Sequence, residues 1–505
     1  MARAVKIGAI HLAVEYGEPE VNRKNILDLA HKAADLGCKI IVSPEMGLTG
    51  YRFHDRKAIA RIVEPDDGPI ASSFKDFAKD RQVYFITAFA ERDRATGMFY
   101  NAVFAFGPEG TLLCKYRKIN AESRWACPGP PGQNNVFDSP WGKIGLLICS
   151  DSYHSLPSRV SALKGAQLLV LPANWPPSNN FPANIWRMRA LENGLWYLAC
   201  NRTGAEEKFK CQESISHLIN PMGEELVAHK SEDSSLMLAE IPLDDKGQFA
   251  FGNLREEILA RRKPWTYHRI YANLLFFRNI TDTLELPKAT AIDAQFLVPG
   301  KWVPPVEFLE DRLDTFFVEN LVVLPLYPYS QDDLMRLEKI SKERKLYLIC
   351  ASEEDGVRTH YLMDRGQELK KVPLSQDCFN DPAILGPLVI YFTKASELIH
   401  PEPVLCAAKK GADLALALEE SFGPNDRFIA TLRPIEQLAV GICAHDGAAL
   451  GLIPEGHVTG RGAYAKGGSS FTYTLDTRIL RDKHFLDRVD FEEILKGGGR
   501  EEDYL

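Results

Sequence analysis

The second half of this 505-residue chain repeats the order of apolar segments found in its first half. Four segment pairs carry the repeat: RAVKIGAIHLAV with ATAIDAQFLV, KIIVSPEMGLTGY with NLVVLPLYPY, LKGAQLLVLP with KKGADLALAL, and MRALENGLWYLAC with LRPIEQLAVGIC. A repeat of about 245 residues indicates the duplication of a whole domain and not a solenoid. We therefore predict two domains, at residues 1–271 and 289–505, joined by an ordered linker at residues 272–288.

Within the first half, strand-like and helix-like segments alternate along the chain. Short apolar runs suited to strands occur at residues 5–12, 39–42, 83–88, 102–106, 144–148, 168–171 and 196–200. Helical periodicity is found at residues 21–36, 70–81, 158–164 and 184–193. Such alternation predicts a layered α/β fold.

Composition and charge indicate a soluble globular protein. The net charge is −8, which gives no electrostatic reason to expect nucleic acid or anionic lipid as a partner. No apolar stretch reaches the ~18 residues of a membrane span, and the N-terminal patch lacks a signal-peptide cleavage site. The ten cysteines form no CxxC pair, which argues against a zinc ribbon and favours the cytoplasm.

One cysteine stands where nucleophiles are commonly placed. The apolar run at residues 144–148 ends abruptly at Cys149, and small or polar residues with Pro157 follow before a helical segment. A cysteine on such a strand-to-helix turn is expected to be exposed, near helix-terminal N–H groups that lower its pKa.

A carboxylate and a cation also occur at the ends of predicted strands. Glu45 follows the strand in KIIVSPEMGLTGY, and Lys118 follows the strand in LLCKYRKIN. Because α/β sheets collect their chemistry at strand ends, these two residues and Cys149 form a candidate set of base, cation and thiol.

These segments resemble the nitrilase superfamily, the carbon–nitrogen hydrolases. PE with TGY matches the family pattern at Glu45, YRK matches it at Lys118, and IC-x-D matches it at Cys149 and Asp151. Glu122, followed by a Pro-Gly pair, matches the family's second glutamate. Two departures concern substrate shape: Ser214 stands where the family usually has glycine, and Ala126 where it usually has an aromatic residue.

The resemblance implies a four-layer αββα sandwich and a thioester mechanism. Glu45 would be the general base for Cys149, and Lys118 with the backbone N–H of Ser150 would hold the oxyanion. Glu122 would orient Lys118 or bind substrate. Such chemistry requires neither a metal nor an organic cofactor. Expected pocket walls, which flank the catalytic segments, are Trp125, Tyr153, His154, Asn174 and Trp175.

Ser150 and Asp151 replace the Trp-Glu pair usual in true nitrilases, which favours a small amide or N-carbamoyl substrate over a nitrile. Capture of the thioester by an amine, as in an acyltransferase or amidotransferase, remains an alternative. A fused ATP-dependent synthetase is rejected, because KGGSS at 466–470 lies outside a strand–loop–helix context. A scaffold protein would require the Glu–Lys–Cys set to be accidental.

The second copy has lost these residues. Leu326 replaces Glu45, a gapless match places Leu374 at Lys118, and the strand GPLVIYFT offers Tyr391 or Phe392 at Cys149. We therefore expect a pseudoenzyme domain. The resemblance implies that it pairs with the first domain as an intrachain pseudo-dimer, in place of a partner subunit; further assembly into a homo-oligomer stays open.

Overall fold

The computed structural model describes residues 3–177, 182–207, 209–271, 280–315, 320–375, 379–454, 460–485 and 488–496. The chain divides into two compact units. The first comprises Met1–Arg262 and Arg488–Ile494, and the second comprises Lys263–Asp487 and Leu495–Leu505.

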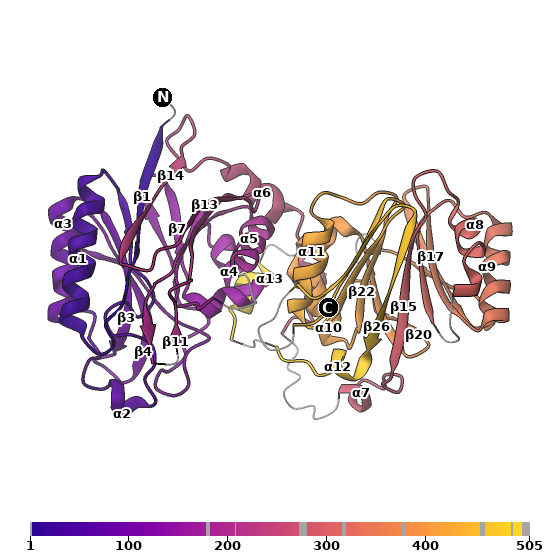
Figure 1. Cartoon of the computed structure of the whole chain (residues 1–505), viewed down its shortest axis with the longest axis horizontal. Coiled ribbons are helices and arrows are strands. Elements are labelled where there is room, and N and C mark those ends of the chain that lie inside the picture. Colours follow the sequence, from indigo (N-terminus) through magenta and orange to yellow (C-terminus); the bar gives the residue numbers. More distant parts are fainter. Residues whose placement is uncertain are drawn as a thin grey trace. The chain divides into compact units, whose positions relative to one another are not determined.

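The first unit is a sandwich of two six-stranded sheets covered by helices on both outer faces (Figure 1). One sheet has the order β14 (Ser235–Pro242), β1 (Ala4–His11), β2 (Ile40–Val42), β3 (Tyr84–Arg92), β4 (Phe99–Phe106), β5 (Leu112–Arg117). The other has the order β13 (Glu225–His229), β12 (Ser216–Ile219), β9 (Trp196–Cys200), β8 (Leu168–Pro172), β7 (Gly142–Leu146), β6 (Val136–Ser139).

Two helix pairs form the outer layers of this unit. Helices α1 (Pro19–Asp35) and α3 (Pro69–Arg81) cover the first sheet, and α4 (Ser155–Leu163) and α5 (Pro182–Asn193) cover the second (Figure 1). Shorter elements complete it: α2 (Arg56–Ile59), η1 (Cys149–Tyr153), β10 (Ala205–Glu206), β11 (Phe209–Lys210) and α6 (Gly252–Ala260). The four-layer αββα architecture expected from the sequence is confirmed.

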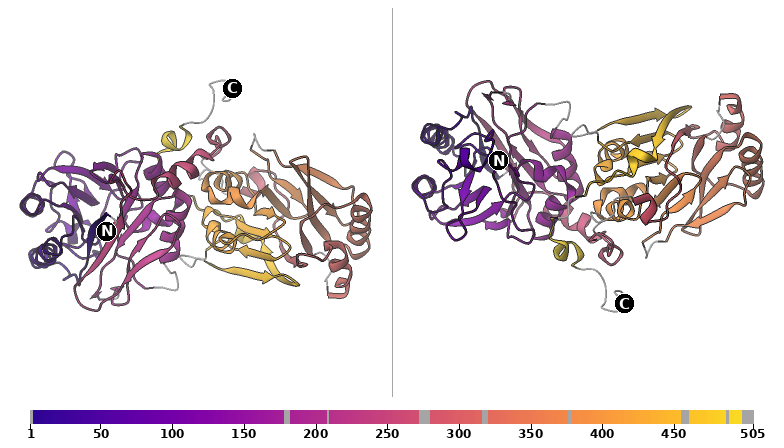
Figure 2. Two further views of the ribbon diagram at one scale, coloured as in Figure 1. Left: turned by 90° about the horizontal axis from the view of Figure 1, so that it is seen from above. Right: turned by 90° about the horizontal axis from the view of Figure 1, so that it is seen from below.

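The second unit has the same strand order. Its sheets are β26 (Ser469–Asp476), β15 (Ala291–Val298), β16 (Leu321–Leu326), β17 (Tyr347–Glu354), β18 (Val357–Asp364), β19 (Lys370–Pro373), and β25 (Gly462–Lys466), β24 (Gly447–Gly451), β23 (Ala439–Cys443), β22 (Leu414–Leu418), β21 (Leu388–Thr393), β20 (Ala383–Leu385). Its helices are α8 (Pro305–Glu310), α9 (Gln331–Arg344), α10 (Pro401–Lys409) and α11 (Asp426–Leu432). The views in Figure 2 display the same layers within each unit.

The remaining elements of the second half are short. They are η2 (Pro264–Thr266), α7 (Ile280–Thr283), η3 (Leu313–Thr315), η4 (Ala395–Ile399), η5 (Arg433–Glu436), α12 (Thr477–Leu480) and α13 (Phe491–Leu495).

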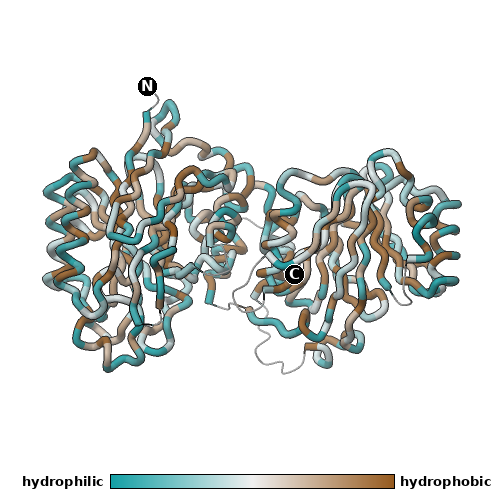
Figure 3. The backbone as a smooth tube through the Cα atoms, in the orientation of Figure 1, coloured by the Kyte–Doolittle hydropathy of each residue, from teal (hydrophilic) through white to brown (hydrophobic). Residues whose placement is uncertain are grey.

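Burial explains why these strands read as continuous apolar runs. In both units the parallel strands pack between the other sheet and the helices, so both of their faces are covered. All residues of β8 and β22 are buried. Figure 3 shows hydrophobic positions gathered on the strands inside each unit, with hydrophilic positions on the outer helices.

Two cysteines make equivalent side-chain contacts in the two units, as expected of tandem copies. The Cys200 thiol points at the carbonyl oxygens of Ile10 and Val42, at 3.4 and 3.5 Å. The Cys443 thiol points at the carbonyl oxygens of Leu297 and Val323, at 3.4 and 3.9 Å. These partners occupy the same positions on the corresponding strands of the two units.

The compact units divide the chain earlier than the predicted boundary at residue 271. Residues 263–271 belong to the second unit, where the Cys406 thiol lies 3.7 Å from the Tyr267 carbonyl oxygen and Lys409 Nζ donates to the Ile270 carbonyl at 2.5 Å. Residues 272–279 of the predicted linker lie outside the described residues. The pairing of the copies as an intrachain pseudo-dimer stays a prediction.

Residues 488–494 return to the first unit, although no motif in the sequence indicates this. Arg262 Nη2 donates to the Ile494 carbonyl at 2.5 Å, and Lys164 Nζ lies 3.3 Å from Asp490 Oδ2. Val489 is buried, and Ile494 has no exposed surface. The first unit therefore requires a segment that follows the second unit in the sequence.

We expect Ile494→Ala to destabilise the first unit by about 2–5 kcal/mol, because it leaves a cavity at a fully buried position. Unfolding of the first unit, followed by differential scanning calorimetry, would then occur at a lower temperature. Ile479→Ala, at a site 55% exposed, is the matched control and should leave this melting temperature unchanged. Equal melting temperatures for both variants would contradict a role of this segment in the first unit.

Candidate active site

The two sheets of the first unit bring three loops together. Glu45 and Lys118 follow β2 and β5, which run in the same direction because β2 is parallel to β3 and two antiparallel pairings lead from β3 to β5. Cys149 follows β7 of the other sheet and begins η1. The carboxyl ends of strands from both sheets thus contribute to one cluster.

Lys118 lies between two carboxylates. Its Nζ is 2.7 Å from Glu45 Oε1 and 2.5 Å from Glu122 Oε1. The Lys118 and Glu45 side chains are 1% and 0% exposed, so solvent does not screen this attraction. The cluster carries two potential negative charges around one ammonium, which leaves room for a proton on one carboxylate.

The pKa values of the two carboxylates move in opposite directions. Burial raises the pKa of Glu45, and the charge of Lys118 offsets this only in part. Burial also acts to raise the pKa of Glu122, but the charge of Lys118 and hydrogen bonds from Lys118, Tyr51 and Asn101 lower it overall. The proton of the pair is therefore held more readily by Glu45 than by Glu122.

Lys118 stays charged in this environment. Burial acts to lower its pKa, but Glu122 and Glu45 raise it well above the usual lysine value. An ammonium that keeps its charge can stabilise an oxyanion but cannot serve as a base.

Cys149 is held in a strained conformation beside Glu45. Its φ is 43°, a left-handed value that is unfavourable for a residue with a side chain and typical of functional sites. Its thiol lies close enough to Glu45 for the negative charge of that carboxylate to raise the thiol pKa, and the backbone N–H of Asn174 acts in the opposite direction. The nucleophile candidate, the base candidate and the cation are thus in one contiguous cluster.

The expectation of an exposed cysteine with a lowered pKa is wrong. Cys149 is 6% exposed, and burial followed by the negative charge of Glu45 raises its pKa well above the usual thiol value. These effects outweigh Lys118 and the hydrogen bond from Asn174. Cys149 rests as a neutral thiol, so its reaction requires proton removal by a neighbouring base.

Asp151 links the loop of Cys149 to the loop of Lys118. Its carboxylate accepts hydrogen bonds from the backbone N–H of Asn120 at 2.7 Å and the hydroxyl of Tyr116 at 2.8 Å. Burial raises its pKa to about 6. These contacts make Asp151 a positioning group, a role that the sequence motif did not reveal.

The expected pocket residues differ in their surroundings. Ser150 Oγ donates to the Asn120 carbonyl at 3.3 Å. Trp125 is buried in an apolar cluster with Met46. The Asn174 side-chain Nδ2 is buried without a hydrogen-bond partner among the described residues.

The other three expected wall residues are aromatic. The Trp175 ring packs edge-to-face on Trp186 at 5.9 Å. The rings of Tyr153 and His154 contact each other at 5.5 Å. The backbone N–H of Asn174 lowers the pKa of the Cys149 thiol.

Two residues of the cluster were missed by sequence reasoning. Asn101 Nδ2 donates to Glu45 Oε1 at 2.7 Å and to Glu122 Oε2 at 3.1 Å. The Tyr51 hydroxyl donates to Glu122 Oε1 at 2.8 Å. A lone asparagine in the apolar strand FYNAVFAF was the available signal, since buried polar side chains need partners.

A sequence model described as carbon–nitrogen hydrolase matches residues 6–251. A nitrilase from Pyrococcus abyssi is 30% identical over 243 residues, which cover 47% of this chain and 90% of the relative. The chain belongs to the carbon–nitrogen hydrolase family. Glu45, Lys118 and Cys149 all lie within the residues of this carbon–nitrogen hydrolase that the family model matches.

Further carbon–nitrogen hydrolases are similar over the same half. Omega-amidase NIT2-B of Xenopus laevis is 29% identical over 258 residues, covering 48% of this chain and 88% of the relative. The crystal structure of Saccharomyces cerevisiae Nit3, from branch 10 of the nitrilase superfamily, aligns with a TM-score of 0.45 and 20% identity over 50% of this chain and 94% of that one.

The described residues contain neither a membrane-spanning helix nor a metal-binding cluster. Within those residues, no helix combines the length and apolarity needed to cross a membrane. The same residues hold no group of three or more His, Cys, Asp or Glu side chains placed to bind a metal ion.

The second unit has apolar residues at the catalytic positions. Leu326 ends β16 where Glu45 follows β2. The Leu374 N–H donates to the Arg358 carbonyl at 2.7 Å, as the Lys118 N–H donates to the Asn101 carbonyl at 2.8 Å. Leu374 is therefore the counterpart of Lys118, as the sequence predicts.

The prediction of Tyr391 or Phe392 at the Cys149 position is wrong. Both lie inside β21, whereas Cys149 begins the 3-10 turn that follows β7. Ala395 begins the corresponding turn, η4. The prediction placed the counterpart within the strand GPLVIYFT, whereas the position belongs to the turn that follows the strand.

Proposed function

We propose that the first unit hydrolyses a small amide or N-carbamoyl compound through a thioester on Cys149. Glu45 removes the thiol proton as sulfur attacks the carbonyl carbon, and the Lys118 ammonium with the Ser150 backbone N–H holds the oxyanion. Glu45 then protonates the leaving nitrogen as the carbon–nitrogen bond breaks. The observation that carries this proposal is the buried Glu45–Lys118 ion pair at 2.7 Å, whose two charges both act on the pKa of the Cys149 thiol at the start of η1.

Water completes the cycle. It attacks the thioester carbon while Glu45 accepts its proton, and collapse of the second tetrahedral intermediate releases the acid and returns the proton to Cys149. Glu122 keeps Lys118 in place through the ion pair between them. All proton transfers are thereby assigned to residues of the cluster.

Ammonia release from a panel of amides, N-carbamoyl compounds and nitriles tests this assignment. We expect turnover of at least one amide or N-carbamoyl compound in the full chain, and none in Cys149→Ala. Turnover of nitriles alone would replace the proposed substrate class. Leu326→Glu should not create activity in the Cys149→Ala chain, because the second unit also lacks the lysine and the thiol.

Hydroxylamine should divert part of the product to a hydroxamate, because a strong nucleophile competes with water for the thioester. Hydroxamate and acid would be measured together at increasing hydroxylamine. Intact turnover without any hydroxamate would argue against a covalent intermediate. Faster transfer to a natural amine than to water would change the proposal to an acyltransferase.

The fall of kcat/KM at low pH, its acid limb, should have an apparent pKa above that of an ordinary glutamate. Glu45 must be deprotonated to act as a base, and burial raises its pKa, so activity falls as pH drops through that raised value. Asn101→Leu removes a hydrogen bond that lowers the pKa of Glu45 and should move the limb to still higher pH. An unchanged limb would show that Asn101 does not act through Glu45.

A further inference from the structure

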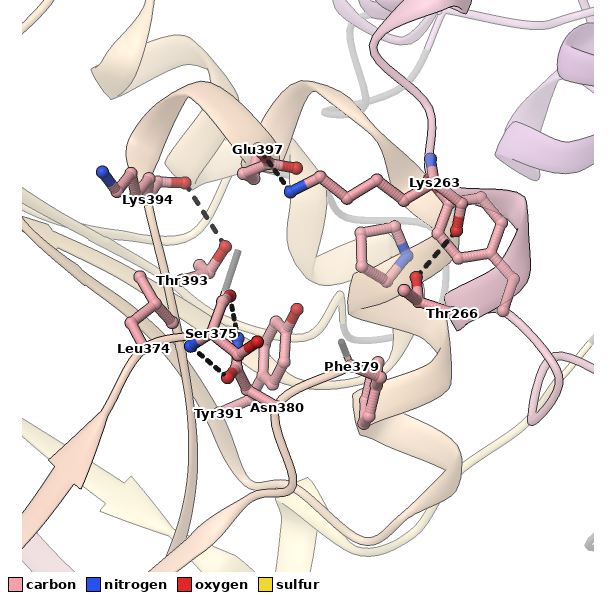
Figure 4. A pocket seen from close by; sticks show the side chains of 12 residues that line it. Lys263, Thr266, Leu374, Ser375, Phe379, Asn380, Tyr391, Thr393, Lys394 and Glu397 are labelled. Carbon is pink, nitrogen blue, oxygen red and sulfur yellow. Dashed lines mark hydrogen bonds and ion pairs between the residues drawn. The ribbon is translucent and has the colours of Figure 1, made fainter. Parts of the chain in front are cut away.

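A cavity of about 220 Å³ lies within the second unit. Its walls include Tyr391 and Thr393 from β21, Glu397 from η4, and Lys263 from the segment that precedes η2. Figure 4 shows these side chains around an open space, with the Tyr391 hydroxyl pointing into it. The volume is below the ~300 Å³ typical of sites for drug-sized ligands, so a small metabolite is the appropriate scale.

The corresponding place in the catalytic unit is much smaller. Ile390 pairs with Leu414 on β22 as Ile144 pairs with Leu168 on β8, and this register makes Thr393 the counterpart of Leu147. The cavity of the first unit that Leu147 lines measures about 10 Å³. The duplicate therefore differs here by an opened space and by a threonine in place of a leucine.

One further wall position differs from the first unit. Ser375 comes directly after Leu374 and so corresponds to Ile119 after Lys118. Ser375 is exposed, and the buried Thr393 donates its hydroxyl to the Lys394 carbonyl at 3.4 Å. Both exchanges therefore place a hydroxyl-bearing side chain on the wall of the opened space.

The charges on the wall select the kind of molecule. Lys263 Nζ lies 3.2 Å from Glu397 Oε1, and these side chains are 31% and 34% exposed. A pair this accessible contributes only about 0–1 kcal/mol, so a ligand can separate it at low cost. Lys394, a further charged residue of the wall, is paired with Glu353 at 3.6 Å. For the Lys263–Glu397 pair, a lone anion would face Glu397 and a lone cation would face Lys263, whereas a zwitterion satisfies both.

The rest of the wall suits an apolar side chain. The Phe379 and Tyr391 rings are stacked, with centroids 5.4 Å apart and an angle of 14° between the planes. Asn380 is fixed by hydrogen bonds with Ser375, its Oδ1 accepting from the backbone N–H at 2.8 Å. In Figure 4 the labelled Lys263 and Glu397 lie across the cavity from the labelled Phe379 and Tyr391.

We propose that the second unit binds a free α-amino acid in this cavity. Lys263 contacts the carboxylate, Glu397 contacts the ammonium group, and the side chain lies against Phe379 and Tyr391. The site is separate from the Glu45–Lys118–Cys149 cluster and gives the non-catalytic copy a function of its own.

The test is calorimetric titration of the full-length Cys149→Ala chain with each standard amino acid. At least one should bind saturably. Its deaminated acid and its decarboxylated amine should each bind at least about tenfold more weakly, because each lacks one of the two charge-assisted contacts. Absence of binding by every amino acid, or equal binding of either one-charge analogue, would overturn the proposal.

Variants then locate the site. Lys263→Met and Glu397→Gln should each weaken binding about tenfold or more, since each removes a charge-assisted contact. The matched control is Lys339→Met with Glu343→Gln, an exposed ion pair on α9 at 3.9 Å, which should not change affinity. Thr393→Leu restores the residue of the catalytic unit, narrows the cavity and should abolish binding while the melting temperature is kept or raised. Binding that survives Thr393→Leu and Lys263→Met but is lost in Glu45→Gln belongs to the active site and contradicts the proposal.

Discussion

Cys149→Ala should abolish turnover, with a loss on the order of 10⁶-fold as found when other covalent hydrolases lose their nucleophile. The variant should fold normally, because alanine is smaller and keeps the backbone turn. Cys149→Ser should fail almost as completely, since the hydroxyl has a far higher pKa than the thiol and Glu45 is a weak base.

Cys127→Ala is the matched control for this variant. Cys127 is the partly exposed free cysteine nearest in sequence to Lys118, and its loss should leave kcat and KM unchanged. Activity that survives in Cys149→Ala but disappears in Cys127→Ala would transfer the nucleophile assignment to Cys127.

Lys118→Met should lower kcat by about 10²–10³-fold, equivalent to roughly 2.7–4 kcal/mol, through loss of the oxyanion partner. A second effect adds to this one. Without the ammonium, the pKa of Glu45 and the pKa of Glu122 both rise, because Lys118 lowers each of them. The acid limb of kcat/KM should therefore move to higher pH in the variant.

The pH profile separates these two effects. A drop in kcat that persists on the high-pH plateau reports the oxyanion, and the displaced limb reports the carboxylates. Lys115→Met is the control on the same strand, since Lys115 pairs with Asp66 and Glu91 instead of the cluster. A Lys118→Met variant with normal kcat at every pH would show that the backbone N–H groups alone hold the oxyanion.

The duplicated fold and the Glu–Lys–Cys set could be predicted because their signals are local. Apolar runs identify the strands, and Glu45, Lys118 and Cys149 lie in short motifs at strand ends. Glu45 and Lys118 lie in the loops that follow β2 and β5 of one sheet, and Cys149 lies in the loop that follows β7 of the other sheet.

The parts that were not predicted depend on partners distant in the sequence. Asn101 meets Glu45 only through the pairing of β4 with β3 and β5. The return of residues 488–494 to the first unit, after a complete second copy, has no local pattern. The pKa of Cys149 was misjudged because burial beside Glu45 cannot be read from an exposed-looking polar turn.

Mass spectrometry of the full chain, acid-quenched during turnover of a slow amide, tests the central claim most directly. We predict a mass increase equal to the acyl group, located by peptide mapping on Cys149 and absent from Cys149→Ala. An acyl group on any other residue would contradict the thioester mechanism. Product formation from a slow amide with no acylated protein detected at any quench time would also contradict it.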